Sequence, residues 1–226
     1  MYAMKLVALK LLTYWRFLFY NNVNNNKSSI WKSKVKIKGG KVTLNNCQLN
    51  SCDISSTGEG NDIFINGWMY KSNILVNGKK NTVIIGKGCE IVKTRIVVRG
   101  NNCKVVIGDN STSGSAFIVC MGHENYILLG EDCMLAEDID IWSTDSHPIF
   151  DDNGTVINPS KPISIGKHVW IGKGVKILKG VTIGNNAVIG MNTLITKDVE
   201  ANSLNIGSPS RTIRRNINWD GHFIDQ

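Results

Sequence analysis

The sequence lacks several features that mark common classes of protein. Its six cysteines include no CxxC pair, which argues against a zinc ribbon and a dithiol redox motif. We expect them to be small buried thiols in a reducing cytoplasm. Within Met1–Tyr20, the charges of Lys5, Lys10 and Arg16 leave at most five uncharged residues between them. Because a bilayer span needs ~20 apolar residues, no transmembrane helix is predicted.

Acidic residues are missing from the N-terminal part of the chain. Eight of the 26 basic residues precede residue 39, whereas none of the 18 acidic residues precedes Asp53. Residues 39–226 are therefore balanced in charge, and the net charge of +8 belongs to the N-terminal arm. This distribution favours attraction of the arm to an anionic surface and predicts no nucleic-acid-binding groove.

Residues 1–34 are predicted to form a basic amphipathic helix followed by a linker. Leu6, Leu9, Trp15 and Phe19 recur at near-helical spacing, and the polar stretch Asn21–Ser29 offers little to bury. The helix would pack on its own protein or a neighbouring subunit, or lie on a membrane surface. No small-residue cleavage site follows it, so we expect a cytoplasmic protein, either free or peripheral at the inner face of the membrane.

Prolines are also scarce: there are four, beside 22 glycines, which favours many tight corners. From residue 165 onward, isoleucines recur at intervals of six. They are Ile165, Ile171, Ile177, Ile183, Ile189 and Ile195. This period fits neither an amphipathic helix nor a simple strand. It fits a solenoid in which each hexapeptide forms one short flat side with an aliphatic residue pointing inward.

The N-terminal half repeats with a longer period. Four segments begin with Gly and have aliphatic residues at +5 and +7, and they start at Gly58, Gly78, Gly100 and Gly122. The glycines are 20, 22 and 22 residues apart. Since three hexapeptides make 18 residues, each coil is predicted to be a three-sided turn with a few extra residues at one corner.

The run of hexapeptides resembles the hexapeptide-repeat acyltransferases, over roughly residues 35–215. The resemblance implies a mainly β fold, a left-handed parallel β-helix with three sides. Residues 35–206 would form this acetyltransferase domain, interrupted by a loop at 143–162, and residues 207–226 would form a C-terminal extension.

The periodicity fails between Ile141 and Ile165, and a loop leaving a rigid repeat is a common place for function. The segment Ser143–Pro148, followed by Pro162–Gly172, resembles the active-site signature of the sugar and polysaccharide O-acetyltransferases, the branch with the maltose, galactoside and capsule enzymes. The resemblance places the catalytic base of that signature on His147. Imidazole suits this role because it is largely a neutral base at cellular pH.

Other candidate residues follow from the same resemblance. Asp145 would orient or charge-stabilise His147, or else stabilise the loop or contact the acceptor. Trp170, at an outward position of the repeat, would lie beside the active site or pack between subunits. The C-terminal run resembles the coenzyme A region of the family, so acetyl-CoA is the expected donor and no metal is expected. Its contacts would be Trp170, Gly172, Gly190, Thr196, Lys197 and Arg211.

The active sites of this family form between subunits of a trimer, so a homotrimer is expected. The acceptor is predicted to be a sugar hydroxyl of a surface polysaccharide or its precursor, with serine or a nucleotide-linked amino sugar as the alternative. Two other classes stay open. One is a non-catalytic scaffold. The other is a hexapeptide-repeat carbonic anhydrase, which needs three zinc-binding imidazoles, and His123, His147 and His168 supply that number without a close histidine pair.

Overall fold

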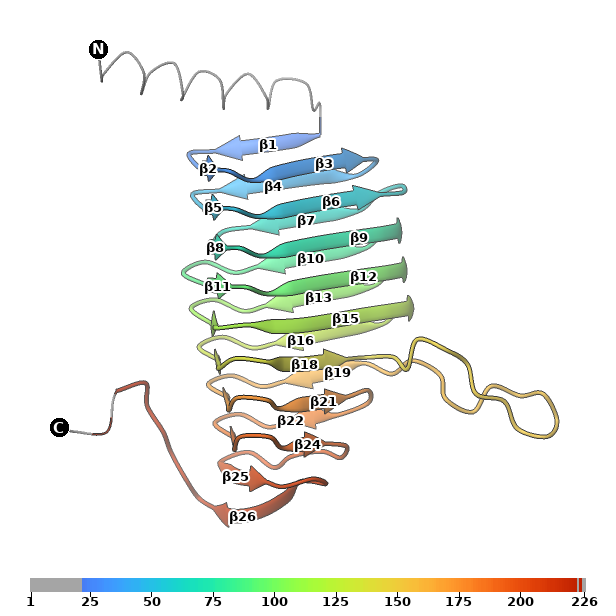
Figure 1. Ribbon diagram of the computed structural model, residues 1–226, viewed down its shortest axis with the longest axis vertical. Helices are drawn as coiled ribbons and strands as arrows, with labels where there is room; N and C mark the ends of the chain where they lie inside the picture. Colours follow the sequence, from blue (N-terminus) through green and yellow to red (C-terminus); the bar gives the residue numbers. More distant parts are fainter. Residues whose placement is uncertain (1–21, 223, 225–226) are drawn as a thin grey trace.

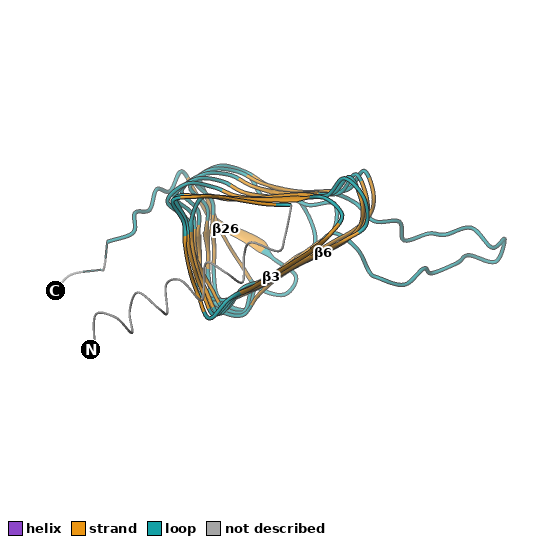
Figure 2. Ribbon diagram, turned by 90° about the horizontal axis from the view of Figure 1, so that it is seen from above, coloured by secondary structure: helices purple, strands orange, loops and turns teal. Residues whose placement is uncertain are grey.

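The computed structural model describes residues 22–222 and residue 224, and the predicted N-terminal helix lies outside these residues. The described chain winds into stacked coils with three flat sides, as Figures 1 and 2 show. Each side is a sheet of strands from successive coils, so neighbouring strands are about 20 residues apart in sequence and pair in parallel. The predicted fold class, a left-handed parallel β-helix, is confirmed.

The three sheets divide the strands between them. Sheet A contains β1 (Val23–Asn26), β4 (Lys41–Asn45), β7 (Asp62–Ile65), β10 (Thr82–Ile85), β13 (Lys104–Ile107), β16 (Tyr126–Leu129), β19 (Ile163–Ile165) and β22 (Thr182–Ile183). Sheet B contains β2 (Ser29–Trp31), β5 (Gln48–Asn50), β8 (Trp68–Tyr70), β11 (Glu90–Val92), β14 (Thr112–Ser113), β17 (Met134–Leu135), β20 (Trp170–Ile171), β23 (Val188–Ile189), β25 (Ser203–Ile206) and β26 (Arg211–Arg215). Sheet C contains β3 (Lys34–Lys38), β6 (Asp53–Thr57), β9 (Asn73–Lys79), β12 (Arg95–Asn101), β15 (Ala116–His123), β18 (Ile139–Trp142), β21 (Lys176–Leu178) and β24 (Leu194–Ile195). We call the corners where two sheets meet the AB, BC and CA edges.

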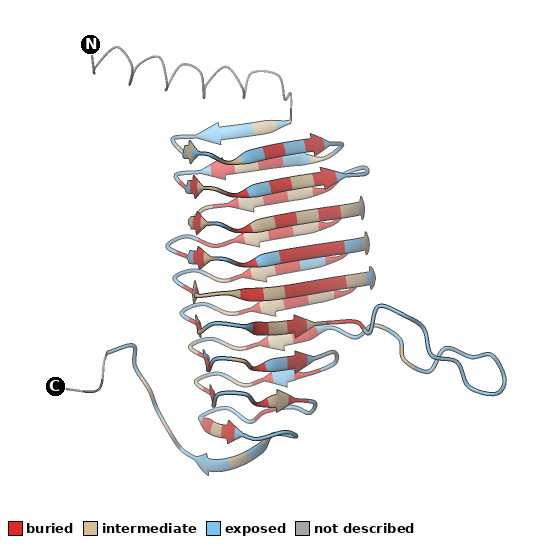
Figure 3. Ribbon diagram, viewed as in Figure 1, coloured by how far each residue is buried: buried red, intermediate tan, exposed pale blue. Residues whose placement is uncertain are grey.

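The core is a column of aliphatic side chains inside the prism. The repeating isoleucines are all at most 4% exposed, as the six-residue period predicts. Figure 3 shows buried positions alternating with exposed or intermediate ones in strands such as β3 and β9, whereas β12 and β15 each carry three consecutive buried residues. Aliphatic residues therefore drive the stacking because each coil buries its inward residues against the coils on either side.

All six cysteines are free and buried, as the sequence analysis predicts. Burial raises the pKa of the Cys133 thiol to about 11. This cysteine is therefore protonated near neutral pH and acts as a small apolar side chain in the core.

Strands are present beyond the predicted repeat at both ends. Residues Val23–Asn26, expected in a linker, form β1 and pair with β4, with Val23 opposite Val42. At the other end, β26 lies in the expected C-terminal extension and pairs with β25 in antiparallel fashion. Backbone pairing to the neighbouring coil orders these polar segments, which have few side chains to bury. In the described part of the chain, no helix is long and apolar enough to cross a membrane.

Candidate active site

The 143–162 loop leaves the prism at the CA edge, between β18 and β19, and projects far from it (Figures 1 and 2). Its two arms run side by side, because Phe150 and Val156 form an antiparallel bridge and Ile157 N donates to Ile149 O at 2.9 Å. At the tip, Asp151 Oδ1 accepts the backbone N–H groups of two residues that follow it. The excursion is therefore an ordered hairpin that starts from a rigid edge.

His147 lies in the first arm of this hairpin and is exposed. Its backbone is held on both sides. His147 N donates to Asp145 O at 2.8 Å, and Asn158 Nδ2 donates to His147 O at 2.9 Å. These contacts fix the main chain at His147, and the residue is accessible to a substrate from solvent.

Asp145 fastens the hairpin to the prism. Its Oδ2 accepts a hydrogen bond from Asn158 Nδ2 at 2.9 Å and forms an ion pair with Lys179, which follows β21 in the next coil. Lys179 Nζ also donates to Asn158 O at 2.8 Å. The hydrogen bond from Lys179, aided by that from Asn158, lowers the pKa of Asp145. The carboxylate thus joins both arms of the hairpin to the coil, and its proposed contact with the imidazole stays a prediction.

A buried asparagine supports the point where the loop leaves the prism. Asn125 Nδ2 donates to Ser143 O at 3.2 Å, Ser143 Oγ at 2.9 Å and Met121 O at 2.8 Å. Ser143 O also accepts from Lys161 N at 3.0 Å, which closes the base of the loop. Asn125 and Ser143 are 4% and 0% exposed, so these hydrogen bonds are shielded from water.

Sequence reasoning did not identify Asn125, Asn158 or Lys179 as parts of the site, and it placed Ser143 in the signature without a role. Asn125 does carry a signal, since asparagine also follows Gly58 and Gly78 three residues later, at Asn61 and Asn81. Those two asparagines donate to the carbonyl oxygens of Gly78 and Gly100 in the next coil. The repeat position predicts a bond between coils. No comparable pattern marks Lys179 or Asn158, because their contacts depend on how the loop folds back.

Two of the expected coenzyme A contacts share the CA edge with His147. Ile141, Ile177 and Ile195 are in register in adjacent coils, so Thr196 and Lys197 occupy the turn of the last of these coils. At a coil spacing of ~4.8 Å, this turn lies about 10 Å from the point where the loop leaves the prism. Both side chains are exposed.

Trp170 lies on sheet B and is 39% exposed. Its ring lies 5.9 Å from that of Trp219, which in turn stacks on His168 at 4.2 Å. His168 Nδ1 is 2.7 Å from Asp132 Oδ2, and its Nε2 is 2.9 Å from Trp219 O. Within the described chain, His168 therefore holds the C-terminal segment against the AB edge.

Gly172 and Gly190 stack at the BC edge, and Arg211 lies exposed on β26 of sheet B. A Cβ on Gly172 would lie 2.8 Å from Ile189 O, so glycine is needed here for the close approach of two coils whether or not a ligand binds. The BC edge and the CA edge lie at opposite sides of sheet C (Figure 2). One subunit therefore places the predicted contacts in two groups, one beside His147 and one away from it.

The three histidines considered for a zinc site are divided in the same way. His123 ends β15 and His147 lies in the loop, both at the CA edge, whereas His168 lies at the AB edge. Among the described residues, no group of three or more His, Cys, Asp or Glu side chains is arranged to hold a metal ion.

Comparison with known proteins links the repeat to transferases. Residues 162–197 match the family described as bacterial transferase hexapeptide (six repeats). A polysialic acid O-acetyltransferase of Escherichia coli O1:K1 / APEC is 42% identical over 110 residues, which are 48% of this chain and 36% of that protein. A polysialic acid O-acetyltransferase of Neisseria meningitidis is 35% identical over 122 residues, or 53% of this chain and 56% of that protein. The matches thus span about a third and about half of these relatives' lengths.

A solved structure extends the similarity to most of the fold. The crystal structure of a polySia-specific acetyltransferase matches 90% of this chain and 91% of its own, with 26% identity and a TM-score of 0.65. The resemblance to hexapeptide-repeat transferases of the O-acetyltransferase branch, predicted from the sequence, is confirmed by these matches.

Proposed function

Starting from this resemblance, we propose that the protein is an acetyl-CoA-dependent O-acetyltransferase that acts on a sugar hydroxyl of a surface polysaccharide or its precursor. One observation carries the proposal: the hairpin that presents His147 is fastened to a prism whose fold and sequence are similar to those of polysialic acid O-acetyltransferases. An ordered, exposed histidine on a rigid edge suits a general base that must meet a large acceptor.

The proposed reaction uses the imidazole of His147 twice. In its neutral form it takes the proton from the acceptor hydroxyl while the oxygen attacks the thioester carbonyl carbon of acetyl-CoA. The carbon–sulfur bond then breaks, and the imidazolium returns the proton to the departing thiolate. The backbone contacts from Asp145 and Asn158 hold the main chain at His147, which keeps the base in place between the two proton transfers.

Acetyl-CoA is proposed as the donor substrate, with its nucleotide end near cationic side chains. Lys197 and Arg211 are exposed and form no ion pair with another described residue, so both are free to meet phosphate groups. They lie on different sides of one subunit. We therefore include in the proposal a homotrimer in which the CA edge of one subunit faces the side of its neighbour that carries Trp170, Gly172, Gly190 and Arg211.

An acceptor panel tests the proposed reaction. Release of free thiol from acetyl-CoA is measured with free sugars, nucleotide sugars, serine, neutral oligosaccharides and oligomers of α-linked sialic acid. We expect turnover with an oligosaccharide, and an ester-linked acetyl group on the product detected by mass spectrometry. Turnover of serine or an amino sugar alone would contradict the proposed acceptor, and no thiol release with any acceptor would contradict the reaction.

A further inference from the structure

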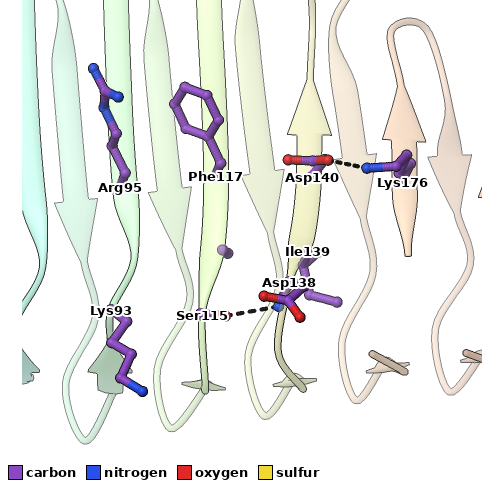
Figure 4. Close-up of a pocket in the computed structure, with 9 residues that line it drawn as sticks. Lys93, Arg95, Ser115, Phe117, Asp138, Ile139, Asp140 and Lys176 are labelled. Atoms are coloured by element: carbon purple, nitrogen blue, oxygen red, sulfur yellow. Dashed lines mark hydrogen bonds and ion pairs between the residues drawn. The ribbon is translucent and has the colours of Figure 1, made fainter. Parts of the chain in front are cut away.

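A depression of ≈ 390 Å³ lies on the outer face of sheet C, next to the BC edge. Figure 4 shows its lining, which comes from four successive coils, those of β12, β15, β18 and β21. The lining includes Lys93, Arg95, Phe117, Asp138, Asp140 and Lys176. Its volume is at the lower end of the range for small-molecule sites, which suits one or two sugar rings.

The charged side chains on one rim of the depression form ion pairs, and those on the other rim form none within the described chain. On one rim, the acids are already paired: Asp140 with Lys176, and Asp138 with Lys173 at 3.6 Å. On the opposite rim, Lys93 and Arg95 are exposed and form no ion pair with any described residue. Asp138 and Asp140 are already paired with Lys173 and Lys176. Lys93 and Arg95 are therefore the two cations among the described lining residues that remain available to an anionic ligand.

An aromatic pair forms the floor between this rim and the loop. The guanidinium carbon of Arg95 lies 5.1 Å from the ring centre of Phe117, and Phe117 meets Trp142 edge to face at 5.2 Å. Trp142 is the last residue of β18, immediately before the loop leaves at Ser143. At ~3.3 Å per residue, the strand from Asp140 to Ser143 covers about 10 Å. Cations, apolar rings and the His147 hairpin thus follow one another across a single face.

Apolar side chains are also closely packed on the outer face of sheet C. Val97 and Val119 occupy outward positions of β12 and β15, yet they are only 3% and 1% exposed. Arg99, two residues beyond Val97, adds an exposed cation about 13 Å along the strand from Arg95. Rigid apolar platforms with cations at intervals suit a carboxylate-bearing sugar chain, because sugar rings pack on aromatic faces and carboxylates pair with arginine.

We propose that this depression is an acceptor subsite for a carboxylate-bearing sugar, in which Lys93 and Arg95 bind the carboxylate and Phe117 contacts the ring. The next sugars of the chain would pass over Trp142 towards His147. The proposal rests on the proposed function for the identity of the reaction, but the binding that it describes is measurable without any acetyl transfer. The shared chemistry is an anion, so the test separates a sugar carboxylate from the phosphates of coenzyme A.

Direct binding provides the first test, in the full chain carrying His147→Ala so that no acceptor is consumed. The probes are an oligomer of α-linked sialic acid and the same oligomer with its carboxyl groups reduced. We expect Lys93→Gln combined with Arg95→Gln to weaken binding of the acidic oligomer roughly tenfold and to leave binding of the reduced oligomer unchanged. Lys104→Gln, on sheet A of the same coil, is the matched control and should bind both probes normally.

Steady-state kinetics in the otherwise unchanged enzyme provide the second test. The double variant should raise KM for the acidic acceptor and leave KM for acetyl-CoA unaltered. A higher KM for acetyl-CoA, equal losses for both oligomers, or a changed oligomeric state would each overturn the proposal, since the cations would then serve the donor, the fold or an interface.

The two proposals fail in different ways. If the wild type binds the acidic oligomer through Lys93 and Arg95 but transfers no acetyl group, the proposed function fails and the subsite stands. If the wild type transfers acetyl groups and the double variant binds and reacts as the wild type does, the subsite alone is overturned.

Discussion

Asp145, Asn158 and Lys179 decide where the His147 hairpin lies relative to the prism. Because Lys179 holds both the carboxylate of Asp145 and the carbonyl of Asn158, its removal should free the hairpin without disturbing the core. We predict that Lys179→Met lowers kcat/KM for acetyl transfer roughly tenfold or more, since small displacements of a catalytic base are costly. Lys167→Met is the control, because it breaks an exposed ion pair with Glu131 at the AB edge and should have little effect.

The same variant should change the titration of Asp145. The folded pKa of this carboxyl is lowered by Lys179, so the docked hairpin is favoured at higher pH and loses this contribution as the pH falls through the lowered value. In Lys179→Met the pKa should move back up towards the ordinary range of an aspartate. A carboxyl-carbon NMR titration measures it, and an unchanged pKa would show that Lys179 does not hold this carboxylate in solution.

His168 gives a second prediction that depends on pH. Both ring nitrogens face acceptors, Trp219 O and the carboxylate of Asp132, so the protonated ring is favoured and the pKa of His168 is raised, chiefly by the hydrogen bond to Trp219. A raised pKa stabilises the docked C-terminal segment fully below the unfolded value of ~6.5, and this contribution is lost as the pH rises through the folded value.

Fluorescence of Trp219 reports this loss, although the chain has other tryptophans, so the difference from Trp219→Phe is measured. We expect its emission to shift towards that of an exposed indole as the pH rises through the raised pKa of His168. His168→Gln should remove the pH dependence, and a shift that persists in this variant would contradict the assignment.

Among single residues, the sequence identified those that belong to a motif. His147 and Asp145 stand in a recognisable signature, and the structure places both in an ordered hairpin. Lys179 and Asn158 could not be predicted, because they meet Asp145 only after the loop folds back on the prism. Which residues position a loop depends on how the loop folds back in three dimensions, and such contacts produce no repeating pattern in the sequence.

At the scale of the coil, glycines at the CA edge allow neighbouring turns to approach closely. Gly100 has φ +134° and an added Cβ would lie 1.8 Å from Gly122 O, so any side chain there would force two coils apart. We predict that Gly100→Ala destabilises the fold by about 3 kcal/mol or more, through backbone strain and overpacking. Thermal unfolding followed by circular dichroism measures the loss.

Gly154, at the tip of the hairpin, is the matched control. It also has a positive φ of +77°, but no atom lies within 4 Å of the position of an added Cβ. Gly154→Ala should therefore show the backbone strain alone, about 1–2 kcal/mol at most. Equal effects at both positions would contradict the claim that close approach of the coils requires Gly100.

The positions of the inward-facing residues could be predicted from the sequence wherever the six-residue repeat was regular. The six-residue period placed every inward isoleucine from Ile165 to Ile195 correctly, because each hexapeptide forms one side. The first coil was not predicted, since Val23–Asn26 is polar and pairs through its backbone with β4. Backbone pairing does not depend on side-chain pattern, so the limits of a solenoid are harder to predict than its interior.

At the scale of the whole molecule, the division of candidate residues between two sides of the prism predicts a shared site. His147→Ala and Trp170→Ala subunits should each be inactive alone. When equal amounts are unfolded and refolded together, a trimer with shared sites should regain about a quarter of the wild-type activity, because a quarter of the interfaces combine two intact contributions.

Mixing His147→Ala with His147→Asn is the control, because both variants lack the same contribution and should regain nothing. Sedimentation as an active monomer, or mixed subunits that stay inactive, would contradict a site shared in this way. The predicted helix of the basic N-terminal arm lies outside the described residues, and the attraction of the arm to an anionic surface stays a prediction.

We propose His147 as the base for acetyl transfer from acetyl-CoA to a sugar hydroxyl. The most direct measurement is transfer of isotope-labelled acetyl from acetyl-CoA to an acidic oligosaccharide, in the wild type and in His147→Ala, with coenzyme A binding measured in both by calorimetry. We predict that the variant binds coenzyme A as the wild type does and transfers acetyl at least about a hundredfold more slowly. Transfer at the wild-type rate by His147→Ala would show that His147 is not the base.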